Sequence, residues 1–453
     1  MGSGIGGGAG WSPGAERLPW VAAEAAQRRV AGGLREAGLG PGDRLLVALP
    51  TSTTVVVLAL GAVRSGIVPV MVNPALLPHE RALVEADAAA ALVVDTPAAA
   101  AAVLQGPPVE LAPVPLARPM HYTSGTTGAP KGVWSGTFDE ATGAAWVREE
   151  TSLWGLGADD VHLFCGPLHH SAPLRFAAMT LLAGGDAVVP GSFDADGFAA
   201  ALTDHRVTST FVVPAHLQRL LGPGGPGPAR LATSSLRLVA HAGAPCPEPL
   251  KRRAIDTFGA DVLWEFYGAT EGQCTACSSP EWLSRPGTVG QARPGRSLAV
   301  DPDGLLWCTV APHARFTYWR DDAATAAAWR DDAFTVGDAG RLDDEGYLFL
   351  EGRRGEIIIT GGVNVAPLEV ERAISACPGI DDVAVFGVDD ERWGQRVCAA
   401  IVGTATSERV MAHARERLSA YKCPKQILVV DAIPRNPTGK LRRATLAADL
   451  GLS

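Results

Sequence analysis

The segment YTSGTTGAPKGV, residues 122–133, constrains this 453-residue chain more than any other. Its three glycines let the backbone adopt conformations closed to other residues and approach a ligand closely. Successive backbone N–H groups in such a loop form a concavity suited to an anion, and hydroxyl side chains add donors. Lysine contributes a mobile charge for phosphate oxygens. The pattern predicts a loop that binds the phosphates of a nucleotide through Thr123, Ser124, Gly125, Thr126, Thr127, Gly128 and Lys131.

By composition alone, the same segment is typical of a surface turn, because Gly, Ser, Thr and Pro also mark turns. The P-loop pattern G-x-x-x-x-G-K-[ST] is not met, since Ala129 and Pro130 separate Gly128 from Lys131. The full string resembles the signature loop of the adenylate-forming superfamily. This superfamily comprises acyl-CoA synthetases, carrier-protein adenylation domains and luciferases.

Short apolar runs alternate with segments that favour helix along the first part of the chain. Strands are expected at residues 45–49, 67–72 and 91–95, and helices at 55–63 and 80–90. Further strands are expected at 187–190, 208–213, 236–240 and 262–266, with connections at 97–119 and 221–230. This alternation predicts a parallel sheet covered by helices. Because ligands of such sheets lie at the carboxyl ends of strands, we expect the motifs found there to share one crevice.

The character of the chain changes near Arg353. Helices are expected to begin at Pro367 and at Ser407, the latter as a cap, with strands at 383–388, 398–402 and 427–430. These elements fit one compact domain. We therefore expect an α/β protein with a large N-terminal domain of parallel or mixed sheets covered by helices, residues 1–352. A small, mobile α+β C-terminal domain, residues 353–453, completes it, and residues 1–10 are expected to form a disordered tail.

Charge and cysteine usage narrow the partners and the compartment. The formal charge of −9 argues against nucleic acid or an anionic membrane as the main partner, and no apolar run is long enough to span a bilayer. Residues 1–10 lack the pattern of a signal peptide, and the eight scattered cysteines fit a reducing compartment, so we expect a cytoplasmic protein. Cys274 and Cys277 form a lone C-x-x-C, which favours ordinary small side chains over a zinc site.

The segment YGATEG, residues 267–272, places a hydroxyl and a carboxylate beside a glycine turn. Alone, Thr270 followed by Glu271 is typical of a helix cap. Mg²⁺, however, prefers a site with few carboxylates together with phosphate oxygens and water. The segment resembles the second nucleotide motif of the superfamily. The resemblance implies that Thr270 is a catalytic residue on the phosphate, that Glu271 holds Mg²⁺, and that Tyr267 and Gly268 flank adenine.

Two further segments would complete the nucleoside site. Gly243, Ala244 and Pro245 resemble the adenine-side segment of the superfamily. Asp338 can accept hydrogen bonds from both ribose hydroxyls, and Arg353 adds donors near the same sugar. The stretch FTVGDAGRLDDEGYLFLEGRRGEIIITGGVNVAPLEVE, residues 334–371, resembles the ribose segment running into the interdomain hinge. Members of the family commonly carry Asp or Lys where this chain has Gly355, so we expect looser domain closure.

Two loops near the C-terminus bear on catalysis and on the acceptor. The string PRNPTGK, residues 434–440, has the composition of a solvated loop but closely resembles the C-terminal catalytic loop of the superfamily. This implies that Lys440 stabilises the charge that develops during adenylation. Gly361 and Gly362 correspond to the family segment that lines the pantetheine path of CoA, where the absence of Cβ suits a narrow tunnel. A plain turn before Pro367 is the alternative.

The string CGPLHHSAP, residues 165–173, resembles the segment that carries the gating aromatic or histidine residue of the family. His170 is assigned to the acyl pocket without a proton-transfer role, because a single histidine is more often structural than catalytic. Ala172, Phe176 and Phe266 are expected to be apolar walls of that pocket.

The resemblance covers nearly the whole chain and implies a cytoplasmic, AMP-forming acyl-CoA synthetase that uses ATP, Mg²⁺ and coenzyme A. The stretch WEFYGATEGQCTACSSPEWLSRPGTVG, residues 264–290, resembles ligases that act on hydrophobic, bulky or ring-containing acids of secondary metabolism or catabolism. An aryl or medium-chain acid stays open, as does transfer of the acyl group to a carrier protein. A nucleotide-binding protein without catalysis is the alternative from another class. The oligomeric state, monomer or homodimer, is open.

Overall fold

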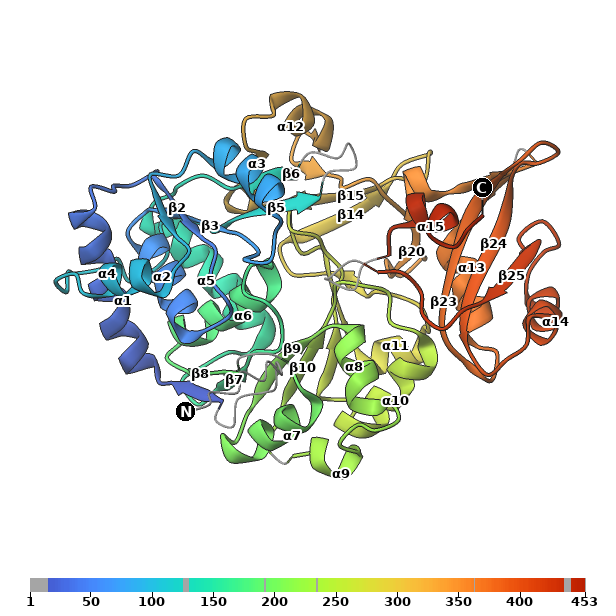
Figure 1. Ribbon diagram of the computed structural model, residues 1–453, viewed down its shortest axis with the longest axis horizontal. Coiled ribbons are helices and arrows are strands. Elements are labelled where there is room, and N and C mark those ends of the chain that lie inside the picture. Colours follow the sequence, from blue (N-terminus) through green and yellow to red (C-terminus); the bar gives the residue numbers. More distant parts are fainter. Residues whose placement is uncertain are drawn as a thin grey trace, which may run out of the picture.

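The computed structural model describes residues 15–124, 130–190, 193–233, 235–361, 363–435 and 441–452 (Figure 1). Several predictions fall outside these residues: the tail at 1–10, and the candidate site residues Gly125, Thr126, Thr127, Gly128, Gly362 and Lys440. The side chain of Ser124 is likewise not described.

An eight-stranded sheet lies in the lower part of Figure 1, in the order β1-β8-β7-β9-β10-β11-β12-β13. Strands β8, β7, β9, β10 and β11 run parallel to their neighbours, and β1, β12 and β13 are antiparallel. Their bounds are β1 Glu16–Leu18, β7 Val161–Leu163, β8 Asp186–Val189, β9 Ser209–Val212, β10 Leu238–His241, β11 Leu263–Glu265, β12 Thr275–Ser278 and β13 Gln291–Ala292.

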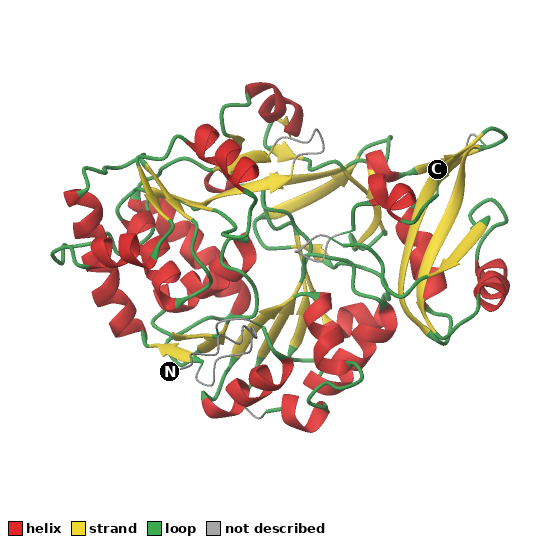
Figure 2. Ribbon diagram, viewed as in Figure 1, coloured by secondary structure: helices red, strands yellow, loops and turns green. Residues whose placement is uncertain are grey.

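Helices cover both faces of this sheet (Figure 2). In β10, Val239 packs into the cluster shared with α7, α8, α9 and α10, whereas Leu238 and Ala240 pack toward α5 and α6. Successive side chains of a strand point to opposite faces, so a short run of apolar residues joins two cores. The helices are α5 Glu140–Trp154, α6 Ser171–Leu182, α7 Ala195–Asp204, α8 Pro214–Leu221, α9 Pro228–Leu231, α10 Glu248–Phe258 and α11 Ser279–Ser284.

A second, six-stranded sheet has the order β16-β6-β5-β3-β2-β4. Helices α1 and α2 pack on one face, where Gly61 lets them approach closely, since a Cβ there would lie 2.7 Å from the Val30 side chain. Helix α3 covers the other face. The elements are α1 Trp20–Glu36, β2 Arg44–Val47, α2 Thr53–Arg64, β3 Val68–Met71, α3 Pro78–Ala88, β4 Leu92–Val94, α4 Pro97–Leu104, β5 Met120–Ser124, β6 Pro130–Trp134 and β16 Thr317–Tyr318.

Smaller sheets follow. Strands β14, β15, β18 and β17 form an antiparallel sheet, and β19 pairs with β20. Their bounds are β14 Arg296–Val300, β15 Leu306–Val310, α12 Asp322–Ala328, β17 Trp329–Arg330, β18 Ala333–Phe334, β19 Asp338–Leu342 and β20 Leu348–Arg353. Short 3₁₀ helices occupy Pro312–Ala314 and Arg354–Glu356.

The C-terminal residues form a sheet of their own, seen at the right of Figure 1. It has two cores: Val385 packs toward α13 and α14, and its neighbours Ala384 and Phe386 pack toward α15. The elements are β21 Ile358–Thr360, β22 Val363–Val365, α13 Pro367–Ser375, β23 Ile380–Asp390, β24 Gly394–Gly403, α14 Ser407–Arg417, β25 Gln426–Val429 and α15 Arg443–Asp449. A division of the chain at residue 352 agrees with this arrangement and stays a prediction.

The α/β fold class is confirmed, and three local predictions are corrected. Residues 97–119 are not wholly a connection, because their alanine-rich start forms α4, capped by the Thr96 side chain accepting from the Ala99 N–H. The expected loop at 221–230 contains the start of α9. Thr406, not Ser407, caps α14, by accepting from the Arg409 N–H.

Two findings concern the membrane and the cysteine pair. Within the described ranges, no helix combines the length and the apolarity needed to cross a bilayer. Cys274 and Cys277 are both buried but pack into different clusters, on either side of β12.

Candidate active site

Lys131 lies directly opposite Thr123 in the hairpin formed by β5 and β6. The Thr123 hydroxyl donates to the Lys131 carbonyl over 3.4 Å, and residues 125–129 connect the two strands. Strand β16 flanks β6 and brings Tyr318 alongside, so that the Lys131 Nζ lies 5.3 Å from the centre of its ring. The same Nζ is 3.5 Å from Asp321 Oδ2. The hairpin thus holds the ammonium beside an aromatic ring and a carboxylate.

Glu271 meets the same tyrosine from the other sheet. The Tyr318 hydroxyl donates to Glu271 Oε1 over 2.8 Å. Burial raises the pKa of Tyr318, and Glu271 adds to the rise, while Arg353 opposes it. Lys131, Glu271 and the charge of Arg353 therefore converge on one phenol, although they are far apart in sequence.

A tight turn presents Thr270 and Glu271. The Ala269 N–H donates to the Gly272 carbonyl over 2.9 Å, and Gly268 pairs with Gln273. A Cβ on Gly268 would lie 2.6 Å from the Gly272 oxygen, so the turn requires glycine there. No helix begins at Thr270, since the next helix, α11, begins at Ser279. The alternative of a helix cap is thereby excluded.

Tyr267, Asp338 and Arg353 form a second contact group. The Tyr267 hydroxyl donates to Asp338 Oδ2 over 2.5 Å, and Arg353 Nε lies 3.4 Å from Asp338 Oδ1. Asp338 begins β19 and pairs with Arg353 at the end of β20, which explains why the two side chains meet. Burial and the nearby Asp338 carboxylate raise the pKa of Tyr267, so this side chain stays a neutral donor.

Gly243, Ala244 and Pro245 follow the carboxyl end of β10, beside Tyr267, which follows β11. Gly243 has a φ of +93°, a left-handed conformation that favours glycine. Gly243 and Pro245 are exposed. This segment offers backbone groups at the edge where the parallel strands end.

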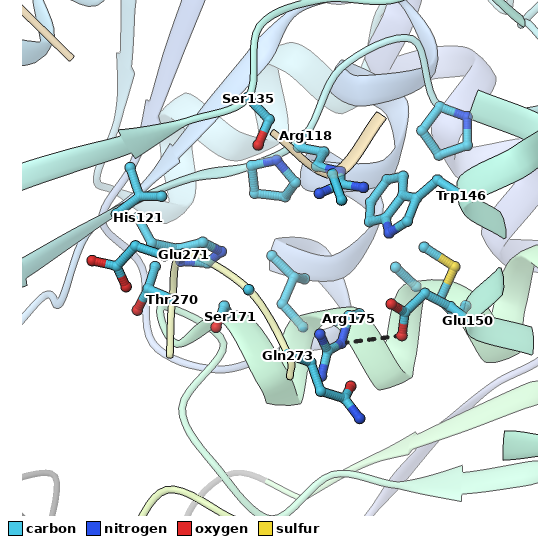
Figure 3. Close-up of a pocket in the computed structure, with 18 of the residues that line it drawn as sticks. Arg118, His121, Ser135, Trp146, Glu150, Ser171, Arg175, Thr270, Glu271 and Gln273 are labelled. Atoms are coloured by element: carbon cyan, nitrogen blue, oxygen red, sulfur yellow. Dashed lines mark ion pairs between the residues drawn. The ribbon is translucent and has the colours of Figure 1, made fainter. Parts of the chain in front are cut away.

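A cavity of about 1000 Å³, including its open mouth, adjoins the Thr270 turn. Figure 3 shows Thr270, Glu271 and His121 on one side of it, and Trp146 and Glu150 on the other. Apolar side chains from α2, α5 and α6 form much of its wall: Ala59, Leu60, Val63, Trp146, Leu174, Ala178, Met179 and Leu182. Polar lining comes from Arg118, His121, Ser135, Glu150, Ser171, Arg175, Thr270, Glu271, Gln273, Arg293 and Arg296.

The predicted pocket residues lie on α6, just before it, or just after β11. Phe176 and Phe266 are almost fully buried and pack against each other and against Phe211, with ring centres 5.5 to 6.2 Å apart. Ala172 packs against the same aromatic cluster, and His170 immediately precedes α6 with its ring 4.4 Å from that of His169. None of the four is among the described residues that line the cavity.

The C-terminal candidates lie in or beside the last sheet. Gly361 joins β21 to β22 with a φ of +59°, and its N–H donates to the Trp393 carbonyl over 2.7 Å. Gly355 lies within a 3₁₀ turn, and a Cβ there would meet nothing within 4 Å. Glu356 beside it pairs with Arg443 at 2.9 Å.

Sequence reasoning missed Tyr318 and the arginines of the cavity. Tyr318 belongs to a two-residue strand without any motif, and its role as a bridge depends on the pairing of β16 with β6. Arg118, Arg175, and the pair Arg293 and Arg296 come from three separate parts of the chain. These arginines belong to no motif and have no characteristic spacing, so the sequence offered no signal for them.

Comparisons with known proteins match this architecture. Residues 13–115 and 117–306 match the AMP-binding enzyme family, and residues 369–440 match the C-terminal domain of AMP-binding enzymes. The chain belongs to the AMP-binding enzyme family. This confirms the expected membership of the adenylate-forming superfamily.

Three similar proteins illustrate the relationship. The indoleacetate–CoA ligase of Aromatoleum aromaticum is 36% identical over 340 residues, which span 71% of this chain and 65% of that protein. A long-chain-fatty-acid–CoA ligase of Mycobacterium tuberculosis is 29% identical over 95% of this chain and 92% of its own length. The crystal structure of ATP-bound MatB from Rhodopseudomonas palustris superposes with a TM-score of 0.81 at 30% identity, covering 95% of this chain and 93% of that one. The relatives support the enzyme class expected from the sequence, an AMP-forming acid–CoA ligase.

Proposed function

We propose that this protein activates a ring-containing carboxylic acid with ATP and transfers the acyl group to coenzyme A. The main support is the place of the turn that carries Thr270 and Glu271. Glu271 accepts a hydrogen bond from Tyr318, whose ring also contacts Lys131, and the same turn lines one side of a cavity with many apolar side chains. Groups suited to phosphate thus adjoin a space suited to an organic acid.

The nucleotide would lie across the ends of the two sheets. Lys131 and the loop before it bind the phosphates, and Thr270 donates to the α-phosphate. Asp338 accepts hydrogen bonds from the ribose, positioned by Tyr267 and Arg353. The exposed backbone of residues 243–245 lies along adenine. The ATP-bound relative supports a nucleotide in this fold.

Glu271 fits a Mg²⁺ site of the kind that has one carboxylate and completes its shell with phosphate oxygens and water. The hydrogen bond from Tyr318 occupies Oε1 and fixes the orientation of the carboxylate. Among the described residues, no group of three or more His, Cys, Asp or Glu could hold a metal without phosphate. Mg²⁺, when bound, neutralises charge on the phosphate oxygens.

Adenylation is then a displacement at phosphorus. A carboxylate oxygen of the acid forms a bond to the α-phosphorus, the bond from that phosphorus to the α,β-bridging oxygen breaks, and pyrophosphate leaves. Positioning and charge stabilisation carry the step, with Thr270 and the C-terminal Lys440 acting on the developing charge. In the second step the CoA sulfur bonds to the acyl carbon, the bond from that carbon to the oxygen bridging it to phosphorus breaks, AMP leaves with this oxygen, and the thiol proton passes to solvent. Gly361 and Gly362 would line the pantetheine path.

The acid is proposed to contain a ring. The relative most similar by identity among those described acts on indoleacetate, and the cavity wall offers the Trp146 indole, Met179 and Leu174. Aromatic side chains and methionine contact flat rings favourably.

Acid-dependent release of pyrophosphate from ATP by the full chain tests the proposal. A screen of aryl, alicyclic and alkyl acids with free CoA should give pyrophosphate and a CoA thioester for at least one ring-containing acid. Pyrophosphate without thioester would instead support the second candidate, transfer to a carrier protein. No pyrophosphate with any acid would favour a nucleotide-binding protein without catalysis.

The division of labour between the steps has its own test. Lys440→Ala should nearly abolish adenylation while thioester formation from supplied acyl-AMP stays largely intact. Equal loss of both steps would contradict the role assigned to Lys440.

A further inference from the structure

We propose that the cavity contains an anion subsite, and that the acid activated by this protein carries a second carboxylate bound there by Arg118 and Arg175. The inference rests on the proposed function and names its substrate class: a dicarboxylic acid with a hydrocarbon or ring body between its two charged ends.

The charges around the cavity do not balance. Four arginines line it against two lining carboxylates, Glu150 and Glu271. The carboxylates in contact with the arginines are Glu149 and Glu150, which leaves a surplus of two positive charges in this contact group. We call these six residues the arginine cluster: Arg118, Glu149, Glu150, Arg175, Arg293 and Arg296. His313 also contacts the cluster, through Nε2 at 2.5 Å from Glu149 Oε2. Burying charge without a counter-charge is costly, so a surplus beside a cavity favours an anionic occupant.

Two of the arginines hydrogen-bond to the two carboxylates. Arg293 donates from Nη1 to Glu150 Oε1 over 2.9 Å and to Gln273 Oε1 over 3.1 Å. Arg296 donates from Nη2 to Glu149 Oε1 over 2.6 Å. Arg293 Nη2 lies 3.0 Å from the same oxygen, in an orientation that suits an ion pair better than a hydrogen bond. Direct hydrogen bonds join this half of the cluster, although Arg293 Nε and Glu150 Oε2 have no hydrogen-bond partner among the described residues.

Arg118 and Arg175 are left without such partners. Arg175 Nε lies 3.5 Å from Glu150 Oε2, which is too long for a good hydrogen bond. The Arg118 guanidinium lies 4.4 Å from the centre of the Trp146 ring. The Nε of each is buried with no hydrogen-bond partner among the described residues. In support, burial lowers the pKa of Arg118 to about 10, and the carboxylates of Glu150 and Glu149 only partly oppose the effect.

The two arginines face the space that a substrate would occupy. Figure 3 shows Arg118 and Arg175 on opposite sides of the space between Thr270 and Trp146. An acid whose reacting carboxylate lies at Thr270 would place its body along the apolar wall and its far end between these guanidinium groups. Arginine binds a carboxylate through two parallel N–H donors, which suits this geometry.

A free inorganic anion shares the same chemistry, and the test must separate the two sources. A carboxylate of the substrate is favoured because the subsite and the Thr270 turn line one continuous cavity. A bound anion that belonged to the fold alone would need no connection to the reaction site.

The experiment measures kcat/KM for pyrophosphate release by the full chain with matched acids. Phenylacetate, phenylpropanoate and phenylbutanoate are each compared with the same acid carrying a carboxylate on the ring. The best diacid should exceed its monoacid by roughly 30-fold or more, the effect of one buried, hydrogen-bonded charge pair. Monoacids that equal or exceed every diacid would overturn the inference.

Variants test whether the preference for diacids depends on Arg118 and Arg175. Arg175→Gln and Arg118→Gln should each lower the ratio of diacid to monoacid activity by about tenfold or more, and Arg175→Lys should retain part of it. The ratio is the readout because a variant that folds poorly lowers both activities together. Arg148→Gln, an exposed arginine on α5, is the matched control and should leave the ratio at the wild-type value. An equal loss for both acids in Arg175→Gln and Arg118→Gln would contradict the subsite.

Two additional arms separate the remaining outcomes. Inorganic phosphate should compete with the diacid; if it instead stimulates monoacids that are used as well as diacids, the subsite holds a free anion and the inference fails. Calorimetric titration without ATP should show tighter binding of the diacid to the wild type than to Arg175→Gln. Monoacid-dependent pyrophosphate release without any diacid preference overturns only this inference, whereas no release with any acid overturns the proposed function.

Discussion

Two buried glutamates, one in each part of the chain, lie beside arginines yet respond in opposite directions. Burial raises the pKa of a carboxyl in both places. At Glu150 the opposing effect of Arg175 and Arg293 is larger, and its pKa lies below the ordinary value. At Glu371 burial outweighs Arg443, and its pKa lies above the ordinary value.

The difference lies in the ratio of cations to carboxylates. Arg443 is shared by Glu371, at 2.5 Å, and Glu356, at 2.9 Å, and its Nε donates to the Val385 carbonyl. Glu371 also accepts from the Val385 N–H over 2.8 Å. Every group here is used, and the cluster joins α15 to α13 and β23. In the arginine cluster, cations outnumber carboxylates and a cavity adjoins them. We call Arg443, Glu356, Glu371 and Val385 the Arg443 network. A network in which every charge is paired holds secondary-structure elements together, whereas unpaired positive charge beside a cavity indicates an anionic ligand.

The largest expected loss of stability comes from removing Arg443 from its network. Arg443→Met leaves two partly buried carboxylates without their cation and should destabilise the C-terminal region by about 3–5 kcal/mol. Hydrogen exchange of the β23 and β24 amides in the full chain measures the change. Arg442→Met, at an exposed neighbour, is the control and should change little. Equal amide protection in the two variants would show that Arg443 does not stabilise the C-terminal region.

Removing a carboxylate from the arginine cluster should destabilise the protein less. Glu150→Gln removes a buried carboxylate, but the arginines that remain can turn toward water or anions in the cavity, so we expect a loss of about 1–2 kcal/mol. Urea unfolding measures the loss, and added sulfate should recover part of it by supplying the missing negative charge. Glu140→Gln, at the exposed first turn of the same helix, serves as the matched control. No recovery in sulfate would argue that the cluster does not accept anions.

Lowering the pH should change the stability of the region around Glu150 and of the region around Glu371 in opposite directions. The stabilisation from Glu150, whose pKa is lowered, is present above the ordinary value of 4.5 and is lost as the pH falls through its folded pKa. The contribution of Glu371, whose pKa is raised, is complete below 4.5 and is lost as the pH rises through its folded pKa.

As the pH falls from 7 toward 4.5, protection of the β23 amides should therefore rise, and as it falls further below 4.5, protection of the α5 amides should fall. Hydrogen exchange corrected for its intrinsic pH dependence provides the measurement. Glu150→Gln and Glu371→Gln should each flatten the slope of their own region. Slopes of the same sign in both regions would contradict the comparison.

The smallest effect concerns the connection between the regions. Arg354 contacts Asp303 of the N-terminal part and Glu356 contacts Arg443 of the C-terminal part, with Gly355 between them. Gly355→Ala meets no steric obstacle and should stabilise the chain by about 0.4–1 kcal/mol, while thioester formation slows relative to adenylation if residue 355 is a hinge. Gly346→Ala is the contrast, since its φ of +83° makes alanine destabilising. An unchanged ratio of the rates of thioester formation and adenylation would show that residue 355 is not a hinge.

Much of the fold could be predicted because its signals are local. The strands β2, β3 and β4 and the helices α2 and α3 follow apolar runs bounded by polar turns, and each was expected within a few residues. The exceptions have local causes as well: α4 lies in an Ala- and Pro-rich segment that composition makes ambiguous, and Thr406 competes with Ser407 as a cap.

The candidate site was predictable only where a motif carries it. Thr270, Glu271 and Asp338 belong to strings that resemble those of a known family, and the structure brings their neighbours into contact through Tyr318 and Tyr267. For the acyl pocket, the one string that resembles the family, residues 165–173, bears only on His170 and Ala172. Phe176 and Phe266 were assigned to it by position, but their side chains pack into an aromatic cluster, and the open space lies against another face of α6.

The sequence by itself determined the order of the elements, the glycine turn at residues 267–272 and the family, because these depend on short segments whose backbone preferences are set by neighbouring residues. Tertiary structure alone decided that four arginines from three distant segments meet two glutamates beside a cavity, and that Tyr318 links Lys131 to Glu271. Charge balance is a property of three-dimensional neighbours, since electrostatic energy depends on separation in space and on burial rather than on spacing along the chain.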